Sequence, residues 1–214
     1  MTSPPGGAAA RRRRPVAVPV AALAVAAGLG VTAALGGLDE APDDPPRRLG
    51  PGAVLDQGEF TTRFVESRTA VRPGRYGGPD KRYLEIVFQV TNKGDETTGV
   101  GAPGQGGKPG HLFAGSLLKV TPEIRNDFGP DVFVQSDGVP GRQLHPGMES
   151  TVVVRYELPE GRRPPGQVRL DVGTFEHAEG FTQEIGWLLA TEDDDGPPVV
   201  AAQVTLPVRR GTAG

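Results

Sequence analysis

The chain contains no cysteine. This absence excludes disulfide bonds, thiolate nucleophiles and cysteine-ligated metal sites, and it excludes a lipoprotein anchor, which requires a modified cysteine. Histidine is scarce as well, because only His111, His145 and His177 are present, and their spacing is not that of metal ligands. We interpret all three as solvated turn residues, and the sequence predicts neither a bound metal nor a cofactor.

Clusters of basic residues are also scarce, because the one strong cluster is the run Arg11–Arg14, and the formal net charge is −3. Beyond this run the chain is mildly acidic, which argues against nucleic acid as a partner. No nucleophile–base arrangement typical of an enzyme is evident either, since Gly115-Ser116 lacks the G-x-S-x-G spacing. We therefore expect a protein that is not an enzyme.

Charged residues are also missing from a stretch of 23 residues, Val16–Leu38. A helix of this length can cross the hydrocarbon core of a bilayer, and the arginines before it predict a cytoplasmic N-terminus. The sequence thus predicts a single-pass cell-membrane protein whose C-terminal part is extracytoplasmic and whose helix contacts the lipid bilayer. The alternative is a signal peptide cleaved near Val31-Thr32-Ala33, which would release a secreted domain.

Glycine and proline, by contrast, are abundant, with 32 and 22 residues. Neither suits a helix interior, so we expect an all-β folded part with many turns. We divide the chain into a disordered basic stub (1–15), the membrane helix or signal anchor (16–38), a Pro-rich linker (39–53), a β-sandwich (54–209) and a disordered tail (210–214).

Alternating hydrophobic residues predict about eight short strands and no amphipathic helix after the membrane segment. In the clearest strand, Tyr83–Thr91, Leu84, Ile86, Phe88 and Val90 share one face. The other expected strands are Phe60–Phe64, Leu117–Ile124, Val132–Val134, Val152–Leu158, Val168–Val172, Phe181–Leu189 and Val200–Val208, the last broken near its end by Pro207. Strands of this length and spacing predict two antiparallel sheets packed face to face.

Turn signals separate these strands. Asn92–Asp95 predicts a turn in which Gly94 can take a positive φ, and His145-Pro146-Gly147 predicts a type II turn. Glu176–Gly180 is turn-like, and Arg162 and Arg163 are typical of an exposed turn. Trp187, the only tryptophan, is interpreted as a core or half-buried residue, with a stacking platform as the alternative.

Three segments together resemble a known family: Arg82–Gly94 (RYLEIVFQVTNKG), Leu144–Gly147 (LHPG) before Val152–Glu160, and the closing Val204–Val208 (VTLPV). They are similar to the immunoglobulin-like extracytoplasmic domains that follow a membrane segment or lipobox in many Gram-positive-type bacterial proteins. The resemblance implies an immunoglobulin-like antiparallel sandwich behind an N-terminal membrane helix. It implies no catalytic residues.

Two loops are the candidate contact sites. The Gly-rich loop 99–110 matches G-x-G-x-x-G, but its prolines forbid the helix that a dinucleotide site needs, so we interpret it as an inter-strand loop. We expect the loops to bind an envelope protein partner or a small ligand; the alternative is binding of divalent cations such as calcium by the acidic run. The residues concerned are Gly101, Gly104, Gly107 and Lys108 in the first loop, and Asp193, Asp194 and Asp195 in the second.

Overall fold

A computed structural model describes residues 45–74, 78–106, 108–124, 129–179, 185–193 and 196–211. The expected stub, the Val16–Leu38 segment, residues 39–44 of the expected linker and the end of the expected tail lie outside the described residues. Among the residues that are described, no helix has the length and hydropathy of a membrane span.

The described residues are mostly β structure. The strands are β1 (Arg47–Leu49), β2 (Val54–Asp56), β3 (Phe60–Arg72), β4 (Lys81–Asn92), β5 (Thr98–Gly99), β6 (Leu117–Thr121), β7 (Asp131–Val134), β8 (Gln143–Leu144), β9 (Glu149–Glu157), β10 (Gln167–Val172), β11 (Phe175–Glu179), β12 (Ile185–Leu189) and β13 (Ala202–Arg210). One short helix, α2 (Leu112–Gly115), interrupts them. The sequence predicted no helix here, and four residues leave no amphipathic pattern to detect.

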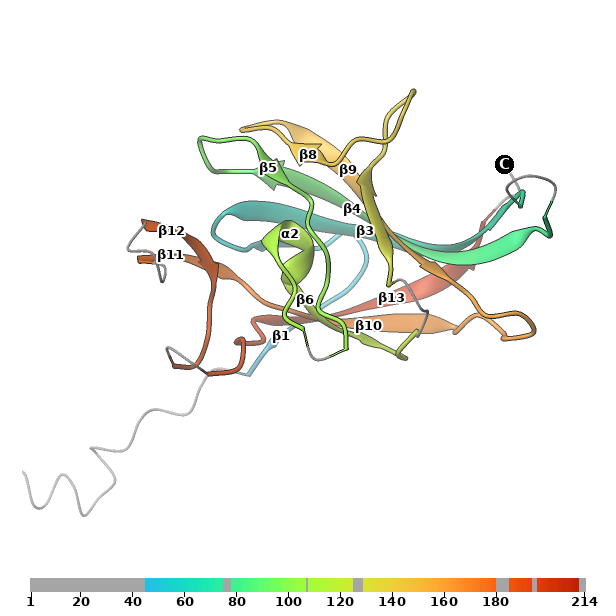
Figure 1. The fold of residues 1–214 in the computed structure, drawn as a ribbon. Helices are drawn as coiled ribbons and strands as arrows, with labels where there is room; N and C mark the ends of the chain where they lie inside the picture. The colour runs from blue at the N-terminus through green and yellow to red at the C-terminus, as the bar shows by residue number, and fades with distance from the viewer. Residues whose placement is uncertain are drawn as a thin grey trace, which may run out of the picture. The chain divides into compact units, whose positions relative to one another are not determined.

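The prediction of two separate antiparallel sheets is wrong, because the two layers belong to one sheet. Nine strands form a single curled mixed sheet, with the order β6-β10-β13-β3-β4-β9-β7, and with β1 on β13 and β2 on β3. Figure 1 shows two layers, one containing β3, β4 and β9 and the other β6, β10 and β13, with α2 at the open end between them. The molecule is therefore sandwich-like, but its layers are joined.

The junction of the layers lies in β13. This strand pairs antiparallel with β10 as far as Pro207, and then parallel with β3 from Val208 to Arg210. Proline has no N–H to donate to a ladder, so it is tolerated where a strand changes partner. Pro207 thus marks a switch of partner rather than the predicted break. The strand β1, which lies inside the expected linker, pairs parallel with the first part of β13, from Ala202 to Val204.

The core confirms the predicted alternation. Leu84, Ile86, Phe88 and Val90 of β4 are fully buried, and so are the alternate residues Val152 and Val154 of β9. Five phenylalanines in this core make edge-to-face contacts with ring centroids 5.3–5.9 Å apart, through the pairs Phe60–Phe113, Phe60–Phe175, Phe64–Phe88 and Phe88–Phe113. Phe113 is supplied by α2, so the short helix fills the space between the layers.

The predicted turns have mixed outcomes. His145–Gly147 is confirmed, because Gly147 has φ +68° and Met148 N donates to His145 O over 3.2 Å. The turn at Arg162 is also confirmed, with its N–H donating to Pro159 O. Gly94 is not among the glycines with positive φ, because Asn92 Oδ1 accepts its N–H and holds the loop in another conformation.

Two further predictions are corrected at the C-terminal side. Glu176–Gly180 was expected as a turn, but residues up to Glu179 form β11, which pairs with β12 in a separate two-stranded sheet. The short run FEHAE has no apolar alternation, so only its partner strand reveals it. The expected strand Leu117–Ile124 ends at Thr121, before Pro122.

Candidate functional site

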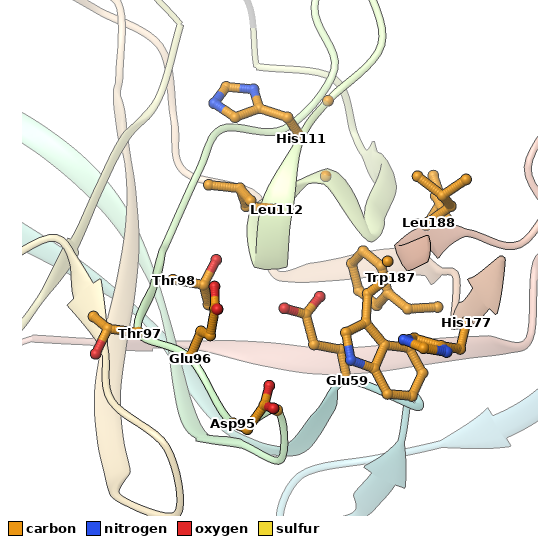
Figure 2. A pocket seen from close by; sticks show the side chains of 16 residues that line it. Glu59, Asp95, Glu96, Thr97, Thr98, His111, Leu112, His177, Trp187 and Leu188 are labelled. Atoms are coloured by element: carbon orange, nitrogen blue, oxygen red, sulfur yellow. The ribbon is translucent and has the colours of Figure 1, made fainter. Parts of the chain in front are cut away.

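A cleft of about 720 Å³ opens at the end of the layers that contains α2 (Figure 2). It lies between the turn before β3, the segment after β4, the start of α2, and the β11–β12 pair. Its lining residues are Glu59, Gly94, Asp95, Glu96, Thr97, Thr98, Gly110, His111, Leu112, Gly115, Phe175, His177, Gly186, Trp187, Leu188 and Leu189.

Two loops at the base of the cleft are tied together by an ion pair. Lys93 Nζ donates to both carboxylate oxygens of Asp56, over 2.7 and 2.9 Å, and Lys93 N donates to Glu59 O over 2.7 Å. The hydrogen bond from Lys93, together with one from Gly58 N–H, lowers the pKa of Asp56. These contacts fix Glu59 relative to the segment that carries Asp95 and Glu96.

A buried amide connects three parts of the chain behind the cleft. The side chain of Gln57 is fully buried; its Nε2 donates to Ser116 Oγ over 2.9 Å and to Gly173 O over 2.7 Å. Its Oε1 accepts the hydroxyl of Thr62, and its main-chain carbonyl accepts Phe175 N–H over 2.7 Å. Because every polar atom of the side chain is used, the β2–β3 turn holds both α2 and β11 in position.

Trp187 forms one wall of the cleft. Its side chain is 38 % exposed, and its ring contacts His177 at 5.2 Å between centroids, across the β11–β12 pair. A Cβ on Gly58 would lie 3.1 Å from Trp187 Cζ3, so the ring packs directly over this glycine. The interpretation of Trp187 as a core or half-buried residue is therefore wrong, because its side chain is among the exposed large hydrophobic ones.

Leu112 lies on the opposite wall in a left-handed conformation, φ 54°, which is rare for a residue other than glycine or asparagine. Hydrogen bonds from Ala102 N to His111 O (3.3 Å) and from His111 N to Ala102 O (3.0 Å) hold this strained backbone in place. Its side chain remains 40 % exposed. Strained residues of this kind are concentrated at ligand sites.

Glu59 is the half-buried acid of the cleft. Its carboxyl group points into the cleft, with Trp187 on one side and the Asp95–Glu96 segment on the other (Figure 2). Loss of hydration on burial raises the pKa of Glu59 from 4.5 to about 7. Within the described part of the chain no side chain donates a hydrogen bond to it, so nothing compensates for that loss.

This raised pKa predicts a pH-dependent stability. A group whose folded-state pKa is raised stabilises the fold most below its unfolded pKa, here 4.5, and this stabilisation is lost as the pH rises through 7. Glu59→Gln should therefore leave the free energy of unfolding unchanged near pH 4 and raise it by about 1 kcal/mol at pH 8, after allowance for solvent screening. Thermal melts between pH 4 and pH 8 measure the difference. Glu160→Gln, in the exposed turn after β9, is the control, and a difference for Glu59→Gln that stays constant with pH would contradict the assignment.

The charge of the described lining is negative. Three carboxylates face the cleft, from Glu59, Asp95 and Glu96, and no lysine or arginine is among the described lining residues. The described residues contain no group of three or more histidines or acids placed to hold a metal ion. The described lining thus combines negative charge with apolar contacts from Trp187 and Leu112.

The loop residues expected from the sequence lie mostly elsewhere. Gly101 has φ +67°, and a Cβ there would meet His111 O and Leu112, so this glycine supports the cleft wall from behind. Gly104 lies in a smaller hollow beside β6, and neither Lys108 nor Asp193 lines the cleft. Gly107, Asp194 and Asp195 lie outside the described residues.

Sequence reasoning did not select the residues that line the cleft. Glu59 precedes a strand and Asp95 and Glu96 follow one, which places these acids at one end of the sheet, because β3 and β4 are antiparallel and Phe60 pairs with Asn92. The pairing of these two strands was therefore the signal that could have brought the three acids together. The wall formed by Trp187 depends on β11, which the sequence did not reveal.

Fold and site together define a mostly β, sandwich-like protein with an acidic, partly apolar cleft at one end of its layers. No protein-family model matches the sequence, and no curated protein matches it. Among solved structures, the chain is similar to an uncharacterized β-sandwich protein from Clostridium difficile 630, with 7 % identity and a TM-score of 0.40; the match covers 78 % of this chain and 97 % of the other.

Proposed function

We propose that residues 45–211 form a non-enzymatic binding module whose cleft takes up a cationic, partly apolar group, such as an amine on a small ligand or a lysine side chain of an envelope protein. The observation that carries the proposal is Glu59, a half-buried carboxyl without a described partner, beside an exposed indole. An acid that lowers stability at neutral pH and gains no internal contact is typical of a binding site.

The scaffold supports the same proposal. We assign the fold to the immunoglobulin-like sandwiches and place it outside the cytoplasmic membrane, behind the Val16–Leu38 helix. Such scaffolds present ligand-binding loops at the ends of rigid layers. Here the segments after β4 and before β3 lie at one such end, and the Asp56–Lys93 pair and the Gln57 hydrogen bonds hold them.

Binding of hexylamine, compared with the neutral 1-hexanol, tests the function. A cation beside Glu59 gains from the negative charge, and its alkyl chain can contact Trp187 and Leu112. At pH 8 we expect hexylamine to bind at least about tenfold more tightly than hexanol. At pH 6, where Glu59 is mostly protonated, we expect hexylamine to bind about tenfold less tightly than hexylamine does at pH 8. Tryptophan fluorescence and NMR titration of the Trp187 indole N–H measure both affinities.

Two variants complete this test. Glu59→Gln should reduce the affinity for hexylamine to that of hexanol and abolish the pH dependence, whereas Glu160→Gln should change neither. Equal binding of the two probes, or an unchanged amine affinity in Glu59→Gln, would contradict the proposal. Displacement of hexylamine by millimolar Ca²⁺ would instead favour a divalent cation as the ligand, the alternative that the acidic run suggested.

A further inference from the structure

A second charged site lies at the other end of β3, on the outer surface of the β3–β4–β9 layer. At its centre is Glu85, whose side chain is only 1 % exposed. Arg155 Nε donates to Glu85 Oε1 over 2.9 Å, and Arg68 Nε donates to Glu85 Oε2 over 3.0 Å. Arg72 approaches the same carboxylate to 3.7 Å, so three guanidinium groups surround one acid.

One of these guanidinium groups, that of Arg155, is also held in place by an aromatic ring. Arg155 packs over the ring of Phe133, 4.5 Å from the centroid, and Phe133 forms a small apolar cluster with Val87 and Val153. Side chains fixed in this way lose little conformational freedom when they bind a ligand.

Positive charge exceeds negative charge around this centre. Two grooves of about 380 and 410 Å³ meet at Arg68, Arg72 and Glu85. Five arginines and two glutamates line them: Arg68, Arg72, Arg155, Arg209 and Arg210, with Glu66 and Glu85. Within the described chain, the guanidinium groups of Arg72 and Arg209 donate no hydrogen bond; each forms a long ion pair of 3.7 Å, with Glu85 and Glu66, and their side chains are 47 % and 69 % exposed.

We infer that these two grooves form an anion site for a ligand with two or more phosphate groups, with Arg72 between them as the shared contact. Arginine matches the oxygens of a phosphate group with paired donors, and such charge-assisted hydrogen bonds are stronger than neutral ones. Glu85 neutralises the buried part of the cluster and orients Arg68 and Arg155, whereas Arg72 and Arg209 keep their donors for the ligand. Glu66 already pairs with Arg68 over 3.0 Å, so it does not repel the ligand as a free acid would.

This site is separate from the cleft. Arg68 follows Glu59 by nine positions along the chain, which in a strand corresponds to roughly 30 Å. In Figure 1 the far ends of β3 and β4 lie away from α2 and the β11–β12 pair. The inference therefore does not depend on the amine proposal.

Titration of the protein with inorganic tripolyphosphate tests the inference, with vesicles of neutral lipid, alone or with phosphatidylglycerol, as a second arm. Arg72→Gln/Arg209→Gln removes two exposed cations that make no described hydrogen bond. We expect this double variant to bind tripolyphosphate at least about tenfold more weakly, with a slope of log Kd against log salt that is smaller by about two. Arg162→Gln/Arg163→Gln, in the exposed turn after β9, makes the same charge change elsewhere, and its affinity should change less than about twofold.

The two arms distinguish the source of the phosphate groups. Binding of tripolyphosphate that depends on Arg72 and Arg209 indicates a soluble ligand. If only the binding of vesicles that contain phosphatidylglycerol depends on these two residues, the ligand is a lipid headgroup. Either result supports the site. Equal losses in the two double variants would show that only net charge matters. That result, or no binding of either probe by the unmodified protein at millimolar phosphate, would overturn the inference.

Discussion

Replacing Gln57 by leucine should lower the free energy of unfolding by about 3 kcal/mol. The two side chains are of similar size, so the change leaves no large cavity. It removes the acceptor of the Thr62 hydroxyl and the donors to Ser116 Oγ and Gly173 O, all of which are buried contacts. Buried polar groups left without partners lose hydration without gaining a hydrogen bond.

Urea denaturation followed by circular dichroism measures this loss. Gln143→Leu is the matched control, because Gln143 is exposed in β8, and its stability should change by less than about 0.5 kcal/mol. Since Gln57 also orients β11, the fluorescence of Trp187 in the native state should shift in Gln57→Leu but not in Gln143→Leu. Equal stabilities of the two variants would show that the buried amide is dispensable.

Replacing Gly58 by alanine should lower the free energy of unfolding by about 3 kcal/mol or more. Gly58 has φ +86°, which disfavours any side chain. A Cβ there would also meet the main-chain carbonyl of Phe175, which cannot move without displacing β11, and would approach the ring of Trp187.

Gly52→Ala separates the two contributions. Gly52 has a similar φ, +80°, but nothing lies within 4 Å of the added Cβ, so only the conformational penalty of about 1 kcal/mol is expected. Thermal melts of the two variants measure the difference, which is the free energy of the close approach between Gly58 and the β11–β12 pair. If Gly58→Ala is no less stable than Gly52→Ala, the wall formed by Trp187 does not rest on Gly58 as described.

Local patterns predicted most strands because alternation reports which face is buried. Leu84, Ile86, Phe88 and Val90 were expected on one face and are all buried. The alternation also holds in β3 for Phe60, Thr62 and Phe64, which are buried, but it ends at a bulge at Val65 that shifts the register between Phe64 and Glu66. Without the bulge, Glu66 and Arg68 would share the face of Phe60 and Phe64; with it, they lie on the outer surface beside Glu85.

Charge was harder to predict than burial. Glu85 alternates with the buried residues Leu84 and Ile86 along β4, and on the opposite face it is buried by arginines from β3 and β9. Its neighbours Arg68 and Arg155 are 17 and 70 positions away along the chain, so only strand pairing brings them together. Likewise, the acids of the cleft come from both sides of the paired ends of β3 and β4, and Trp187 reaches them from β12, whose partner β11 shows no alternation.

The sequence alone determined the β class, the positions of most strands and the identity of the buried face, because side chains alternate along any strand whatever its partner. It determined the type II turn for the same reason, since proline and glycine restrict the backbone locally. The tertiary structure alone decided that β13 joins the two layers, that the acids and the indole share one cleft, and that five arginines gather at the other end. These features depend on strand order and register, which are set by long-range pairing energies that no short segment contains.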